Sequence, residues 1–374
     1  MAETADSRTL VVEEFTFHRL TFNTDEHEEI GKRLTIGMGK NLTLPNGVRL
    51  QFAYIVALAG DFYGIPKEPI VNPLVNPNQS ADSLQRFKNA YSTLANTPHT
   101  GKFKERLEEL VEMIRQETDG PNLHCHHSNQ AWDEASGGWW IGGIPIWPGN
   151  MLKLAHKNFD HFGSRAKRAY ETGHGYAIEK AREAGRSMGR DREKLRDMAY
   201  SIEAFALHFF TDAFASGHIR TPRAELQFNV TPSLIGDLLS KFMHDEDNKF
   251  GLRVTNLRGD TWIAYGDGML IQKNDKDNFN FVAEAAQTSV DQVFMAYQDP
   301  DIKLDPCEVT DFLPFLDEEE KNNTPLFQIK DGELHRRSDI NDLQCKETTT
   351  DWWGSTTAWE LWRYKPKNPA IPLI

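Results

Sequence analysis

The pattern of hydrophobic and polar positions predicts a chain built mainly from helices up to about residue 250. Apolar residues recur three and four positions apart within 103–116, including Leu107, Leu110 and Ile114, which is the spacing of one helix face. The stretch 25–38 follows Asn23 and Thr24, residue types that cap helix N-termini. Further helical patterns occupy 83–94, 150–184, 191–214 and 233–244, and an apolar run occupies 51–60 and ends just before Asp61.

The pattern of apolar and polar residues changes after Gly251. Two β-prone runs, 253–255 and 262–265, lie on either side of a turn at Gly259 and predict a hairpin. A helix is expected at 281–297, and the tail from 299 is rich first in Pro and Asp and then in Trp. We therefore expect a mainly α fold, with a multi-helix domain over 15–250 and a C-terminal α+β extension over 251–374.

Net charge and composition limit the kinds of binding partner that we expect. The formal charge of -13 disfavours general attraction to nucleic-acid phosphates or anionic lipid surfaces. No run of eighteen apolar residues predicts a membrane span, and residues 1–14 lack the basic and then apolar order of a secretory signal. We expect a cytoplasmic protein or one exported by a non-classical route. The cysteines, Cys125, Cys307 and Cys345, do not indicate a disulfide framework, although one bridge is left open.

Histidine and aspartate at fixed spacing give the strongest chemical signal. His208, Asp212 and His218 form the pattern H-x3-D-x5-H. Residues four apart on a helix share a face, so His208 and Asp212 can reach one metal ion. The Ser216-Gly217 pair then interrupts the helix and leaves His218 to turn toward a neighbouring ion. Imidazole with carboxylate is the ligand mix of catalytic zinc sites.

A structural interpretation competes with the metal site. One histidine could cap a helix while Asp212 pairs with Arg220 or Arg223. Further histidines and carboxylates favour the metal site, because they recur in short segments elsewhere. These segments are Glu26-His27, Gly60-Asp61, Asp160-His161 and 244–248.

With these motifs the sequence resembles the zinc-dependent phospholipase C and single-strand nuclease superfamily. It is most similar to the branch of bacterial phosphatidylcholine-hydrolysing phospholipases C. The likeness rests on 208–218 together with the segments 57–64, 158–162 and 244–248, and it spans roughly residues 20 to 270.

The resemblance implies a helical zinc metallohydrolase that binds two to three zinc ions. One ion would take Asp61, His161, His208 and Asp212, with Asp212 bridging to another. A second would take His218, His244 and a carboxylate that follows His244. A third would take His27 and the shared Asp212, with His18 as a possible replacement for the N-terminal amine that secreted members use.

The carboxylate after His244 has two candidate positions. On a continuing helix the third and fourth residues beyond His244 share its face, and these are Asp247 and Asn248. Carboxylates, not neutral amides, are usual zinc donors. We therefore predict Asp247 as the ligand, with Asn248 orienting it.

The resemblance also implies a reaction. A zinc-bound hydroxide, available because zinc lowers the pKa of its water to about 7, would attack the glycerol-side phosphodiester of phosphatidylcholine at a membrane surface. Diacylglycerol and phosphocholine would be released, with Asp61 as a catalytic proton acceptor. Phe62 and Tyr63 would bind the choline cation through their ring faces, unless they only pack in the core.

Two other functions stay open. The same zinc site could belong to a nuclease or 3'-nucleotidase, although the acidic chain makes a nucleic-acid partner less expected. The metals could also serve folding alone, in a non-catalytic, zinc-stabilised lipid-binding protein.

Overall fold

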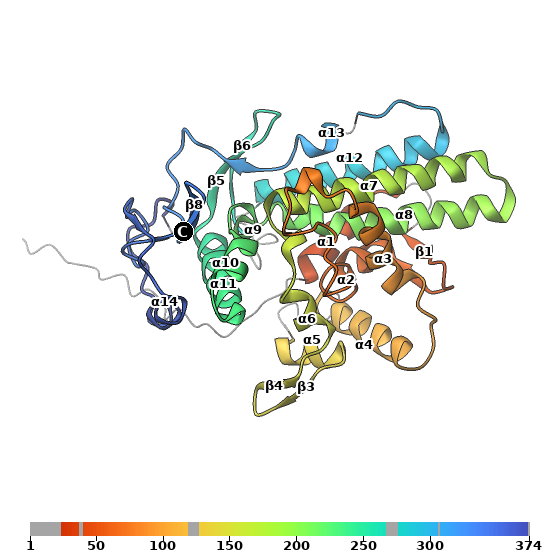
Figure 1. Ribbon diagram of the computed structural model, residues 1–374. Helices are drawn as coiled ribbons and strands as arrows, with labels where there is room; N and C mark the ends of the chain where they lie inside the picture. The colour runs from red at the N-terminus through yellow and green to blue at the C-terminus, as the bar shows by residue number, and fades with distance from the viewer. Residues whose placement is uncertain (1–23, 37–39, 119–126, 267–275, 306, 373–374) are drawn as a thin grey trace, which may run out of the picture.

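A computed structural model describes residues 24–36, 40–118, 127–266, 276–305 and 307–372. Within these ranges the protein is mainly α-helical, with four small separate sheets around the helices (Figure 1), so the predicted fold class is confirmed at that level. Among the described residues, no helix combines the length and the apolar character needed to cross a membrane.

The helices divide into a first group up to the long pair and a second group after it. The first group is α1 (Thr24–Arg33), α2 (Phe52–Leu58), α3 (Ser83–Ala95), α4 (Gly101–Thr118), α5 (Asn129–Ala135), α6 (Asn150–Ala155), α7 (Gly163–Arg186) and α8 (Gly189–Asp212). The second group is α9 (Ser216–Ile219), α10 (Arg223–Asn229), α11 (Ser233–Phe250), α12 (Lys276–Gln298), α13 (Cys307–Thr310) and α14 (Gly354–Leu361). Two short 3-10 helices are η1 (Pro77–Gln79) and η2 (Phe159–His161).

The strands are short and antiparallel. They are β1 (Asn41–Thr43) with β2 (Arg49–Gln51), β3 (Trp139–Ile141) with β4 (Ile144–Trp147), β5 (Leu252–Thr255) with β6 (Thr261–Ala264) and β7 (Phe315–Leu316), and β8 (Phe327–Lys330) with β9 (Glu333–Arg337) and β10 (Thr348–Thr349). The β5–β6 pair confirms the predicted hairpin, with Thr255 opposite Thr261. The stretch 120–149, which the sequence did not resolve into elements, contains α5 and the β3–β4 hairpin.

The long helices α7 and α8 pack side by side, with α12 packed against both (Figure 1). Small residues on α7 allow close packing: a Cβ at Gly173 would lie only 2.6 Å from the Cβ of Ala206 on α8. The second half of α8, from Ala199 to Asp212, is buried throughout. Helix α2, also fully buried, covers α8 on another side. Polar side chains near the end of α8 are consequently held inside the protein.

Two apolar clusters hold the chain together. The larger contains residues of α1, α2, α7 and α8 and also of β5, β6 and α12. The smaller joins α10 and α11 to β8 and α14 of the tail. The clusters thus divide the chain differently from the boundary predicted between residues 250 and 251, and the two-domain organisation stays a prediction.

Candidate metal centre

Histidine and aspartate side chains from six elements meet at the end of α8. Helix α1 supplies His27, the turn after α2 supplies Asp61, η2 supplies His161, α8 supplies His208 and Asp212, α9 supplies His218, and α11 supplies His244. His208 has no exposed surface, and Asp61, His161 and Asp212 are each buried.

Two groups of these side chains have ligand atoms close enough to hold a metal ion. One group is His27, His208 and Asp212, and the other is Asp61, His161 and His208; within each group the ligand atoms lie within 4.8 Å of one another. Asp212 joins the groups, because its Oδ1 is 3.3 Å from His27 Nε2 and its Oδ2 is 2.7 Å from His161 Nδ1. The structure therefore brings together five of the predicted ligands in buried groups that could bind a metal ion.

The ring of His208 is oriented as a metal ligand would be. Its Nδ1 lies 3.0 Å from the carbonyl oxygen of Val56, which can only accept, so Nδ1 donates and the neutral ring has its lone pair at Nε2. Nε2 makes no hydrogen bond and lies 3.6 Å from an Asp212 oxygen and 4.0 Å from an Asp61 oxygen. A lone pair facing two carboxylates is repelled unless a cation lies between them, so the residues fit a bound metal.

His27 has the same orientation. Its Nδ1 lies 2.6 Å from Thr211 Oγ1, whose own hydrogen is directed to the carbonyl oxygens of Leu207 and His208. The hydroxyl therefore accepts, and His27 Nδ1 donates. The lone pair of the neutral ring is then at Nε2, the atom that faces Asp212.

The histidines predicted for a second ion also meet. The Nε2 atoms of His218 and His244 are 3.0 Å apart. His218 Nδ1 donates to the carbonyl oxygen of His161, and His244 Nδ1 donates to the carboxylate of Asp245. In neutral rings both lone pairs would therefore be on the facing Nε2 atoms. Two facing lone pairs repel one another unless a cation or a hydrogen-bond donor lies beside them, and the amide nitrogen of Asn248 lies 3.2 Å from His244 Nε2.

Burial and charge set the protonation of the centre. Burial lowers the pKa of His208 well below its usual value and thus keeps the ring neutral. Burial acts the same way on His161, but the carboxylates of Asp212, Asp61 and Asp160 outweigh it and raise the pKa of His161 to about 9. Asp212 is buried too, and the charge and hydrogen bond of the protonated His161 nevertheless hold its pKa well below the usual range. Without a metal, His161 is therefore the protonated partner of Asp212.

Gly60 makes the close approach of Asp61 possible. Its φ of +68° lies in the left-handed region that favours glycine. A Cβ at this position would lie 2.4 Å from His208 Cδ2 and 2.8 Å from His161 Cε1. Any other residue would displace the imidazoles, so glycine here is required by the packing of the centre.

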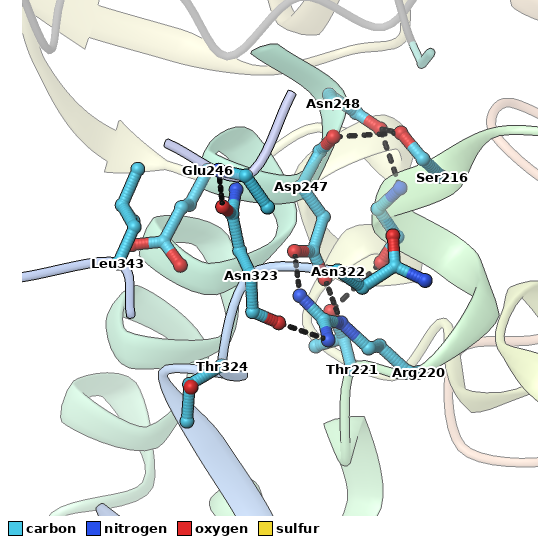
Figure 2. A network of polar contacts seen from close by, with 12 residues as sticks. Ser216, Arg220, Thr221, Glu246, Asp247, Asn248, Asn322, Asn323, Thr324 and Leu343 are labelled. Carbon is cyan, nitrogen blue, oxygen red and sulfur yellow. Dashed lines mark hydrogen bonds and ion pairs between the residues drawn. The ribbon is translucent and has the colours of Figure 1, made fainter. Parts of the chain in front are cut away.

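The structure corrects the prediction that Asp247 is a metal ligand. Both oxygens of this fully buried carboxylate are bound by Arg220, at 2.9 Å from Nε and 2.6 Å from Nη2 (Figure 2). Arg220 also donates to the carbonyl oxygen of Asn323, 2.9 Å away in the tail. The guanidinium of Arg220 thus neutralises the carboxylate. The prediction of Asp247 rested on ligand type alone and did not include this contact.

Asn248 lies beside the two histidines instead. Its Oδ1 accepts from the backbone N–H of Gly217 at 2.6 Å (Figure 2). This bond turns its amide nitrogen toward His244 Nε2 at 3.2 Å. A Cβ at Gly217 would lie 2.6 Å from that same Oδ1. The backbone of α9 therefore fixes Asn248 in place. The sequence indicated its position on the helix but not this contact.

The structure also corrects the role predicted for Phe62. Its ring is 2% exposed and packs 5.3 Å from the ring of Trp132, so it forms part of the core and not of a choline site. Tyr63 is buried as well, but it borders a small pocket that reaches His161 and Asp160. Its contact with choline stays a prediction.

Asp160, for which the sequence predicted no role, is buried beside His161 and accepts the N–H of Ile70 at 2.7 Å. His18, the possible third-ion ligand, lies outside the described residues. Comparisons with protein-family models, with curated proteins and with solved structures found no match to this chain.

Proposed function

We propose that the chain is a zinc-dependent phospholipase C that hydrolyses the glycerol-side phosphodiester of phospholipids, with phosphatidylcholine as the expected substrate. One observation carries the proposal: the buried Nε2 of His208 faces the carboxylates of Asp61 and Asp212 without a hydrogen bond. This arrangement is unfavourable for an imidazole alone and suits a metal ligand.

The donor set favours zinc among divalent ions. Imidazole nitrogens with a few carboxylate oxygens suit zinc, whereas magnesium and calcium prefer oxygen ligands. His27, Asp61, His161, His208 and Asp212 would hold two neighbouring ions, and the pair of His218 and His244 would contribute to another. Bound zinc would supply an acidified water and would stabilise negative charge on a phosphodiester.

The protein's own residues would orient the ligand rings and accept the proton of the attacking water. The carbonyl oxygens of Val56 and His161 and the hydroxyl of Thr211 fix the rings so that Nε2 is the ligand atom. Asp61, which is adjacent to His208, would accept the proton released by the attacking water. The lipid substrate itself is inferred from the family resemblance.

His208→Ala should abolish phosphodiester hydrolysis and remove at least one zinc ion per chain, because it deletes a nitrogen shared by both ligand groups. Zinc would be counted by mass spectrometry, and hydrolysis measured on a panel of phospholipids, on single-stranded DNA and on 3'-nucleotides, with and without chelator. His335→Ala, a half-buried histidine on β9, is the matched control.

Normal zinc content and full hydrolysis in His208→Ala would refute the site. Hydrolysis of nucleic acid but not of any phospholipid would identify the nuclease instead. Stoichiometric zinc without hydrolysis of any substrate would favour the lipid-binding alternative.

A further inference from the structure

The β3–β4 hairpin projects from the body of the protein beyond α5 and α6 (Figure 1). It is apolar and exposed: the exposed fractions are Trp139 56%, Ile141 54%, Ile144 63%, Ile146 46% and Trp147 67%. No residue between 135 and 152 is charged. Exposed apolar patches of this kind mark interaction sites on proteins.

The apolar residues lie on both faces of the hairpin. Neighbouring side chains on a strand point to opposite faces, and Ile146 and Trp147, which are adjacent on β4, are both exposed. A partner helix or sheet would cover only one of these faces. An apolar medium that surrounds the hairpin would cover both.

The order of residues along the hairpin fits a lipid bilayer. Ile141 pairs with Ile144 next to the Gly142-Gly143 turn at the tip, and Trp139 pairs with Trp147 at the base. Tryptophan prefers the boundary between water and lipid, and isoleucine prefers the hydrocarbon interior. The hairpin therefore places each residue type at the depth that it prefers.

The base of the hairpin is fixed to the protein by the fully buried Asp133. Its Oδ2 accepts from Trp140 Nε1 at 2.8 Å and from the N–H of Gly149 at 3.0 Å, and its backbone oxygen accepts from Gly138. These bonds hold both strands where they leave the body. Little conformational freedom at the base is then lost on insertion.

The same base is bonded to the segment that carries Asp61. Trp132 packs on the ring of Phe62, and Asn150 Nδ2, just after the hairpin, donates to the carbonyl oxygen of Phe62 at 2.7 Å. Phe62 directly follows Asp61. The hairpin and the metal centre are thus held at a fixed relative position.

We propose that this hairpin inserts into the surface layer of a zwitterionic phospholipid bilayer. The chain's charge of -13 opposes adsorption to anionic lipids, and an uncharged hairpin needs no opposite charge. The proposal names the surface on which the proposed phospholipase would act and in that respect rests on the proposed function. Binding, however, can be measured without turnover.

The test is flotation of the full-length protein with phosphatidylcholine vesicles, with chelator present to prevent hydrolysis. The double variant Trp139→Ala/Trp147→Ala should lower the partition coefficient by about tenfold or more, because two large apolar side chains leave the lipid. The control is Trp359→Ala/Trp362→Ala, with Trp359 on α14 and Trp362 directly after it. Both residues are 62% exposed, and the control should change partitioning by less than about twofold.

Absence of vesicle binding by the unmodified protein, or equal losses in both double variants, would overturn the proposal. Self-association that disappears in the hairpin variant, with vesicle binding unchanged, would assign the hairpin to a second copy of the chain. Hydrolysis of a soluble short-chain phosphodiester by the unmodified protein, measured without chelator, separates the two ideas. It is absent if the proposed function is wrong, and it is present while vesicle binding is absent if only insertion is wrong.

Discussion

At the scale of single residues, Asp247 and Asn248 are neighbours on one helix with different roles. The carboxylate of Asp247 forms an ion pair with Arg220, and the amide of Asn248 is held between the N–H of Gly217 and His244. Because zinc binds carboxylates more often than amides, the sequence favoured Asp247 as the ligand. The side chain that reaches the histidines is decided by what else lies within reach of the helix.

Asp247→Asn should keep the zinc content unchanged and lower the free energy of unfolding by about 3 to 5 kcal/mol, because Arg220 loses its buried partner. Asn248→Ala should also keep the zinc content, because Asp245 still holds His244 Nδ1 and no amide then donates to Nε2, and should cost about 1 to 3 kcal/mol for the unsatisfied N–H of Gly217. Denaturant unfolding and zinc stoichiometry are measured on both variants. Loss of zinc from Asp247→Asn with zinc retained by Asn248→Ala would restore the original assignment.

At the scale of elements, buried titratable side chains join helices around the centre. Glu117 at the end of α4 is 7% exposed and accepts a hydrogen bond from the N–H of His127 at 2.6 Å. The carboxylate of Asp25 on α1 repels its negative charge. Burial, with Asp25, raises the pKa of Glu117 from 4.5 to about 7. The fold therefore favours the protonated carboxyl at a contact between α1, α4 and α5.

Glu117→Gln should stabilise the protein at pH 8 and have little effect at pH 5. The pKa of Glu117 is higher in the folded than in the unfolded protein, so the folded state favours the protonated carboxyl. The stability that this carboxyl contributes is fully present below pH 4.5 and is lost as the pH rises through about 7. The neutral amide avoids this loss, and the gain at pH 8 should approach about 3 kcal/mol at most. Unfolding curves at both pH values measure it. An equal effect at pH 5 and pH 8 would show that burial of the charge is not the cause.

At the scale of the whole molecule, the tail is tied to α11 by a fully buried ion pair. Arg337 on β9 binds both oxygens of Glu246, at 2.9 and 2.7 Å, and Tyr364 donates to the same carboxylate. Arg337 and Glu246 have no exposed surface. Glu246 lies two residues beyond His244, so docking of the tail steadies the helix that supplies this histidine.

Arg337→Met should lower the free energy of unfolding by about 3 to 5 kcal/mol, because it leaves Glu246 buried without its partner. The double variant Arg337→Met/Glu246→Met removes both charges and should recover most of that loss. Denaturant unfolding of the single and double variants gives both numbers. A single variant as stable as the unmodified protein would show that the ion pair does not hold the tail in place.

The sequence by itself determined the helical character of the chain and the β5–β6 hairpin, and it indicated the histidines and aspartates that form the candidate metal groups. Helical spacing and turn residues act locally, and a four-residue interval on α8 places His208 and Asp212 on one face whatever surrounds them. The tertiary structure alone decided which neighbours each side chain meets. Arg220, directly after α9, reaches Asp247, Trp132 reaches Phe62 from α5, and Arg337 reaches Glu246 from the tail. Such contacts between distant segments leave no periodic signal in the sequence.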